Sequence, residues 1–185
     1  MERQPSLITE RLVLRSFELG DAPLVTILAG EREIACNTLH IPHPYEVGMA
    51  EDWICTHQDA YTRGVQVIFA IVRQNDNRLM GAIGLDIERG HNRAEMGYWI
   101  GKPYWSKGYC TEAARAVLKY GFEKLELNRI QASYFSRNIA SGRVMEKIGM
   151  SYEGCLRSHI YKWGEYLDQV TRAILKSEYE AGINK

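Results

Sequence analysis

Apolar and polar residues alternate in several short stretches of the chain, and a two-residue period is typical of β-strands. The clearest case is the stretch 95–100, where Met96, Tyr98 and Ile100 alternate with Gly97 and Trp99. Other stretches are apolar and rich in β-branched residues, which also favours strands. The pattern predicts about seven strands: residues 7–15, 65–73, 79–87, 95–100, 129–135, 151–161 and 166–176.

From Thr111 the apolar spacing changes to three and four residues, which places the apolar side chains on one face of a helix. That face carries Ala114, Val117, Leu118, Gly121, Phe122 and Leu125. Further helices are predicted after Asp21, over residues 46–61, and from Asn138 to Gly149, a glycine that would end the last of these helices. The helix after Asp21, with that residue as a plausible N-cap, contains Leu24, Ile27 and Leu28.

Turn residues separate these elements. Residues 75–77 and 162–165 would close two hairpins, residues 89–92 form another turn, and the prolines in 38–45 predict a loop. Pro103 ends the strand 95–100, since proline cannot donate to a strand ladder. The resulting order of elements predicts a mixed α/β fold, in which helices cover the faces of one sheet.

Composition narrows the class of protein. The 185 residues are expected to form a single domain, 1–185, with an ordinary share of 45% hydrophobic residues. Lys+Arg and Asp+Glu balance at 23 each, so no overall charge draws the protein to nucleic acid or membrane. The polar start Met1–Pro5 is unlike a signal peptide, and four widely spaced cysteines suit reduced thiols. We therefore expect a cytoplasmic protein.

Gly108 lies in the loop between the strand 95–100 and the helix that follows. The first amides of a helix have no partner within it and carry partial positive charge, so they can bind a phosphate. A glycine lets the backbone approach such a ligand closely. The simpler alternative is that Gly108 only makes a turn.

The motifs around this loop resemble the GNAT N-acetyltransferases. Trp105-Ser-Lys-Gly-Tyr-Cys110, followed by Thr111-Glu-Ala, is similar to their acyl-CoA pyrophosphate loop, Q/R-x-x-G-x-G/A. Trp105 stands in place of Gln or Arg, and Cys110 in place of a small residue. Along nearly its whole length the chain resembles the RimJ/RimL-type branch of this family. That branch acetylates the N-termini of ribosomal proteins and other amines. The further matching stretches are Thr9–Arg15, Ile41–Pro44, Asn138–Ser141 and Val144–Met150.

This resemblance implies a GNAT fold, with a mostly antiparallel sheet in which two strands splay apart around the acyl-CoA. It implies acetyl-CoA as co-substrate, no metal, and an amine acceptor. The implied cofactor contacts are Tyr98, Trp99, Ile100, Trp105, Ser106, Lys107, Gly108, Tyr109, Cys110, Thr111, Asn138 and Ser141. Glu95 is implied as the base and Ser141 as the proton donor to the leaving thiolate.

Several of these residues also have a structural interpretation. Lys107 can be a solvated loop lysine, Asn138 a helix cap, and Ser141 part of the first helical turn. Glu95 can be a surface carboxylate at a strand end. Cys110 is interpreted as a packing residue, because no histidine partner is visible for a nucleophile. The five histidines lack metal-ligand spacing.

The acceptor is predicted to be a protein N-terminal α-amine. Its pKa of about 7.7–8.0 makes deprotonation near pH 7 cost about 1 kcal/mol, against about 4–5 kcal/mol for a lysine. A site without a histidine base therefore suits an α-amine better than a lysine side chain. His43, Glu153 and Tyr161 are candidate acceptor contacts.

The alternatives are a small-molecule amine (a polyamine or antibiotic), a non-catalytic CoA-binding module, and a phosphotransferase, for which no G-x-x-x-x-G-K-[ST] run is present. The oligomeric state stays open, a homodimer included.

Overall fold

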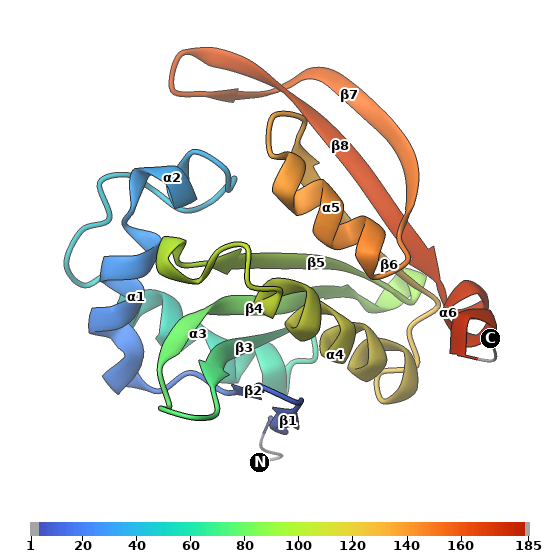
Figure 1. Cartoon of the computed structure of the whole chain (residues 1–185), viewed down its shortest axis with the longest axis horizontal. Helices are drawn as coiled ribbons and strands as arrows, with labels where there is room; N and C mark the ends of the chain where they lie inside the picture. The colour runs from blue at the N-terminus through green and yellow to red at the C-terminus, as the bar shows by residue number, and fades with distance from the viewer. Residues whose placement is uncertain (1–3, 184–185) are drawn as a thin grey trace.

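The computed structural model describes residues 4–183, and one eight-stranded sheet runs through them (Figure 1). The strand order is β1-β2-β3-β4-β5-β6-β8-β7, and among the strand pairs of the described residues only β5–β6 is parallel. The predicted mixed, mostly antiparallel sheet is confirmed, with eight strands. The prediction about Met1–Pro5 concerns in part residues 1–3, which lie outside the described range. The strands are β1 (Leu7–Ile8), β2 (Leu12–Arg15), β3 (Gln66–Arg73), β4 (Leu79–Glu88), β5 (Arg93–Ile100), β6 (Arg129–Phe135), β7 (Ser151–Lys162) and β8 (Glu165–Leu175).

Helices cover both faces of the sheet, as predicted. The helices are α1 (Ala22–Ala29), α2 (Arg32–Ala35), α3 (Met49–Thr62), α4 (Tyr109–Glu123), α5 (Ile139–Lys147) and α6 (Lys176–Ile183). The larger apolar core lies between the sheet and α4 and α5, and a smaller core lies under α1 and α3. Within residues 4–183, no helix combines the length and apolar character that a membrane crossing needs.

The helix α4 buries the face that the sequence predicts. Ala114, Val117, Leu118 and Phe122 are each at most 2% exposed, whereas Leu125 lies beyond the end of the helix. Gly121 is needed within this face, because a Cβ there would lie 2.6 Å from the Ile130 side chain. This packing fixes the N-terminus of α4 next to the end of β5.

The predicted first strand, residues 7–15, is wrong as one element. The chain turns at residues 9–11, and β1 pairs with β2 through Leu7–Leu14. The reason is local: Thr9 donates its N–H to the Leu12 carbonyl, and its hydroxyl accepts from the Leu12 N–H at 3.0 Å. The helices α2 and α6 are not predicted: α2 has only four residues, and α6 begins directly at the end of β8, where the predicted strand extends to residue 176.

Asp21 precedes α1 but does not cap it with its side chain. Its carboxylate instead pairs with Arg15 at 2.7 Å and accepts from the Glu18 N–H at 2.9 Å. Asn138 does cap its helix, and Gly149 has the predicted left-handed conformation, with φ of 90°. The tip of the β7–β8 hairpin also lies where predicted, with positive φ at Trp163 and Gly164.

His57 of α3 is buried between Phe17 and Trp53, with 8% of its surface exposed. Within the described residues neither of its ring nitrogens has a hydrogen-bond partner. Burial lowers the pKa of His57 from 6.5 to about 4. The neutral ring is therefore the form that the folded protein accommodates.

We expect His57 to make stability depend on pH. Its folded pKa is depressed, so the unfolded chain binds a proton more readily, and stability falls as the pH drops from 6.5 toward 4. At pH 5 this loss is about 2 kcal/mol, at about 1.36 kcal/mol per pH unit. Urea unfolding at pH 7.5 and pH 5 measures this loss in the free energy of unfolding. His57→Leu should remove the part of the pH dependence that comes from His57. The same pH dependence in both proteins would contradict the assignment.

Candidate active site

The strand pair at the centre of the sheet separates after three residue pairs. β5 and β6 are aligned only from Arg93–Arg129 to Glu95–Gln131. Beyond this point β5 continues along β4 to Ile100, and β6 continues along β8 to Phe135 (Figure 1). The predicted splay is confirmed, and it leaves residues 96–100 unpaired on the side that faces β6.

The backbone of β5 offers polar groups to this unpaired edge. In an antiparallel pair, successive residues turn their N–H and C=O groups alternately toward and away from the partner strand. Gly101 donates its N–H to the Met80 carbonyl at 2.8 Å, so odd-numbered residues of β5 face β4. The backbone of Tyr98 and the N–H of Ile100 therefore face the gap. The backbone contact predicted for Tyr98, Trp99 and Ile100 stays a prediction, and of the three the Trp99 backbone faces β4 instead of the gap.

The loop between β5 and α4 presents a run of unused N–H groups. Among the described residues, none accepts a hydrogen bond from the N–H groups of residues 106–111. Ser106 and Gly108 have φ angles of 59° and 81°, and left-handed residues of this kind occur in loops whose amides bind anions. The helix adds its N-terminal partial positive charge at the same place. The arrangement suits a diphosphate.

Two side chains of this loop are engaged with the backbone. The Trp105 indole N–H donates to the Ile100 carbonyl at 2.6 Å, so that carbonyl is not open to a ligand. The Lys107 ammonium donates to the Pro103 carbonyl at 2.9 Å. The amides of the loop are thus its principal free donors, and Lys107 adds charge nearby.

One residue that contacts the loop is not predicted by the sequence pattern. Arg11, in the turn between β1 and β2, donates to the Lys107 carbonyl at 3.0 Å and pairs with Glu112 at 2.6 Å. Arg11 and Lys107 are 96 positions apart, so no local pattern could bring them together. The matching stretch Thr9–Arg15 was the available signal, but its alternation was interpreted as a strand.

Cys110 lies in the first turn of α4. Burial raises the pKa of its thiol to about 12. At neutral pH the thiol is therefore protonated and a poor nucleophile, since the thiolate is the reactive form. This agrees with the interpretation of Cys110 as a packing residue.

On the α4 and α5 side, side chains connect the two diverging strands. The Tyr98 hydroxyl lies 2.9 Å from Ser141 Oγ and 3.1 Å from the Ser141 carbonyl. Burial raises the pKa of Tyr98 well above its usual range, so the hydroxyl keeps its proton. Asn138 Oδ1 accepts from the Ser141 N–H at 3.2 Å, as a helix cap does. The Asn138 amide nitrogen has no partner within residues 4–183 and is open to a ligand.

Glu95 lies where β5 and β6 separate, on the opposite face of the sheet from Ser141. Its carboxylate is exposed and accepts a long hydrogen bond of 3.4 Å from Gln131. Asp86 of β4 is its cross-strand neighbour and is bonded by Gln66. A hollow of about 250 Å³ lies here, and its lining includes Asp86, Glu95 and Gln131. The hollow is large enough for water molecules between Glu95 and a substrate.

The three candidate acceptor contacts do not lie together. His43 is 3.1 Å from the Gly30 carbonyl, and its ring is 6.0 Å from that of Trp163. Tyr161 is exposed near the same hairpin tip. Glu153 lies toward the other end of β7 and pairs with Arg129 at 2.5 Å. The structure therefore groups His43 with the hairpin tip and separates Glu153 from it.

The hairpin tip is tied to the segment after α2. The Lys162 ammonium donates to the Thr38 carbonyl at 2.5 Å, and the Arg137 guanidinium donates to the Cys36 carbonyl at 2.9 Å. These contacts connect the last strands of the sheet to the N-terminal third of the chain. His43 lies in the same segment, against the Gly30 carbonyl at the end of α1.

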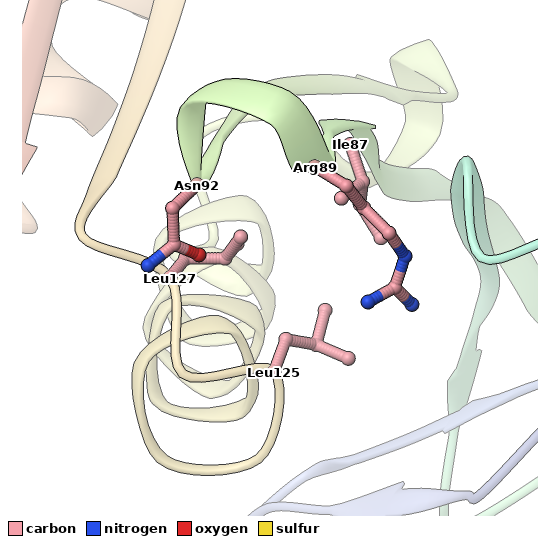
Figure 2. A pocket seen from close by; sticks show the side chains of 5 residues that line it. All are labelled: Ile87, Arg89, Asn92, Leu125 and Leu127. Atoms are coloured by element: carbon pink, nitrogen blue, oxygen red, sulfur yellow. The ribbon is translucent and has the colours of Figure 1, made fainter.

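A smaller hollow, of about 60 Å³, lies beside the turn that precedes β5 (Figure 2). No predicted site residue lines it, and Figure 2 shows the Arg89 side chain directed away from Asn92. Arg89 donates to the Gly64 carbonyl at 3.0 Å. The lining residues are Ile87, Arg89, Asn92, Leu125 and Leu127.

Comparison with known proteins identifies the family. Residues 11–151 match the model of the acetyltransferase (GNAT) domain, and the chain belongs to this family. It is 32% identical over 175 residues to the uncharacterized N-acetyltransferase p20 of Bacillus licheniformis, covering 94% of this chain and 98% of that protein. It is 40% identical over 106 residues to YdaF of Bacillus subtilis, whose name proposes a ribosomal N-acetyltransferase, covering 57% and 58%.

Solved structures share the fold. A GNAT acetyltransferase from Bacillus anthracis is 30% identical, with a TM-score of 0.84 and coverage of 94% and 99%. RimL, the ribosomal L7/L12 alpha-N-protein acetyltransferase bound to CoA, is 18% identical, with a TM-score of 0.85 and coverage of 92% and 98%. Spermidine N-acetyltransferase of Vibrio cholerae, with CoA and spermine, is 24% identical, with a TM-score of 0.80 and coverage of 93% and 99%. The family match and the N-acetyltransferase relatives show that the protein is an acetyl-CoA-dependent N-acetyltransferase.

Proposed function

We propose that the protein transfers the acetyl group of acetyl-CoA to the α-amine of a protein N-terminus, by direct attack in a ternary complex. The observation that supports this most is the gap beside β5, next to the free amides of residues 106–111. A donor held by those amides would extend into the gap, where Glu95 lies on one face of the sheet and Ser141 on the other.

In this proposal the donor binds largely through backbone groups. The amides of residues 106–111 hold the diphosphate, with the Lys107 ammonium and the Ser106 and Thr111 hydroxyls close by. The backbone of Tyr98 and the N–H of Ile100 bond the pantetheine arm as a neighbouring strand would. The amide nitrogen of Asn138 supplies a further donor from the opposite edge.

The transfer then needs two proton movements. The amine nitrogen attacks the thioester carbonyl carbon, the new C–N bond forms, and the C–S bond breaks. Glu95 accepts the amine proton, directly or through water in the adjacent hollow, and Ser141 donates a proton to the thiolate. Because a thiol pKa is about 8.5, protonation of the leaving group contributes less than deprotonation of the amine.

The residues around Glu95 favour an amine that loses its proton easily. The lining of the hollow contains no histidine. An exposed carboxylate is a weak base, which suffices for an α-amine at a cost of about 1 kcal/mol but less well for lysine at about 4–5 kcal/mol. His43 and Tyr161 are proposed to contact the acceptor, whereas Glu153 would first have to release Arg129.

A polyamine acceptor is the second candidate. Asp86 and Glu95 are cross-strand neighbours, and neither forms an ion pair with a cationic side chain among the described residues. Like charges directly opposite each other are unfavourable, and a second ammonium group of the acceptor would relieve the repulsion. The spermidine N-acetyltransferase with this fold makes this class worth testing alongside the first.

Free thiol release from acetyl-CoA tests the acceptor class. The panel consists of peptides with a free α-amine, the same peptides with a blocked N-terminus and an internal lysine, spermidine, and free amino acids. We expect turnover with the free α-amine peptides and little with the blocked ones. Turnover of spermidine alone would favour the second candidate, and tight CoA binding without turnover of any acceptor would contradict both.

Glu95→Gln should lower kcat/KM for the best acceptor by about 100-fold or more, the usual contribution of a general base. Glu88→Gln is a matched control, because Glu88 of β4 lies on the same face of the sheet as Glu95 but is already paired with Arg93 at 2.6 Å. Initial rates of both variants at constant acetyl-CoA provide the comparison. An equal effect of the two substitutions would exclude Glu95 as the base.

The Tyr98 hydroxyl is proposed to orient the Ser141 hydroxyl. Ser141→Ala should lower kcat about tenfold, a modest loss because the thiolate is a good leaving group. Tyr98→Phe should cost less, and the double variant should match Ser141→Ala alone. Additive losses in kcat would mean that Tyr98 acts independently of Ser141.

A further inference from the structure

A residue near the N-terminal end of the chain holds the loop between β5 and α4. Arg11 Nη1 donates to the Lys107 carbonyl at 3.0 Å, and its Nε donates to Glu112 Oε2 at 2.7 Å. The Arg11 backbone N–H donates to Glu112 Oε1 at 2.8 Å. The guanidinium lies 4.7 Å from the centre of the Tyr109 ring. Arg11 thus contacts both the loop and the first turn of α4.

Glu112 anchors this arrangement in its ionised form. Thr9 donates its hydroxyl to Glu112 Oε1 at 2.6 Å, beside the bonds from Arg11. Desolvation alone would raise the pKa of Glu112, but these hydrogen bonds and the Arg11 charge outweigh it and hold the pKa below its usual value. The carboxylate therefore fixes the position of the guanidinium.

The bond from Arg11 to the Lys107 carbonyl sets the direction of an amide. In a trans peptide the C=O and N–H groups lie in one plane and point in opposite directions. Since Arg11 holds the carbonyl on its own side, the N–H of Gly108 points to the other side. A free carbonyl in this loop would oppose a phosphate, and Arg11 keeps this one turned away.

We propose that Arg11 is a positioning residue for the donor, which aims the Gly108 amide at the diphosphate of CoA. The proposal rests on the proposed function, because it assigns the diphosphate to this loop. The competing interpretation is an ion pair that merely ties the β1–β2 turn to α4. Such a pair would affect every donor equally, whereas an aimed amide matters only to a donor with a diphosphate.

Acetyl-CoA and acetylpantetheine, which lacks the diphosphate, separate the two interpretations. We expect Arg11→Gln to raise the Kd of CoA about tenfold, to lower kcat/KM for acetyl-CoA in proportion, and to leave kcat/KM for acetylpantetheine unchanged. Arg11→Lys should be intermediate, because an ammonium lacks the fixed fork that binds both partners. The control is Arg63→Gln, which breaks the exposed pair with Asp59 on α3. It should leave the Kd of CoA and kcat/KM for both donors unchanged.

Equal losses with both donors, or an unchanged Kd of CoA, would overturn the proposal. Calorimetric titration with CoA needs no acceptor, so this result stands even if the proposed acceptor class fails. If Arg11→Gln proves too unstable to assay, the CoA titration of Arg11→Lys decides the question, since that variant keeps a positive charge beside Glu112.

Discussion

The pairing of β5 with β6 ends after three residues, and the rest of the site depends on this. Both strands stay bonded to their outer neighbours, β5 to β4 and β6 to β8, so the unpaired edges are held apart by regular structure. Backbone groups on such edges need partners from a ligand or from water. An extended arm with amide groups can supply them, as an added strand would.

The gap also divides the chemistry between two faces of the sheet. Tyr98 and Ser141 lie on the face covered by α4 and α5, where the donor sulfur would leave. Glu95 lies on the face of α1 and α3, where an amine would arrive. The segment after α2 contacts Lys162 at the tip of the β7–β8 hairpin and Arg137 after β6. In the proposed function, acceptor choice would therefore fall to irregular segments, and donor binding to the sheet and one helix end.

Local patterns predicted the regular parts of the fold well. The alternation at residues 95–100 and the three-and-four spacing after Thr111 identified β5 and α4, because burial of one face sets both periods. The split of residues 7–15 into two strands was missed, since hydrogen bonds of Thr9 outweigh an alternation that continues through the turn. The motif around Gly108 locates the loop before α4. Its free amides are predicted too, because the first N–H groups of a helix have no partner within the helix.

Contacts between distant segments could not be predicted in the same way. Arg11 meets Lys107, and Lys162 meets Thr38, only because the sheet brings separate segments side by side. The orientation of the Trp99 backbone depends on strand register, which the hydrophobic pattern alone leaves open. The Tyr98–Ser141 contact likewise requires that α5 pack against the gap, a tertiary arrangement without a local sequence signal.

Amide hydrogen exchange with and without CoA tests the central claim most directly. If the diphosphate binds the loop amides and the pantetheine arm bonds the unpaired edge, CoA should slow exchange at residues 106–111 and at Tyr98 and Ile100. The amide of Trp99 already faces β4 and should change little. Unchanged exchange at residues 106–111 with CoA bound would contradict the account.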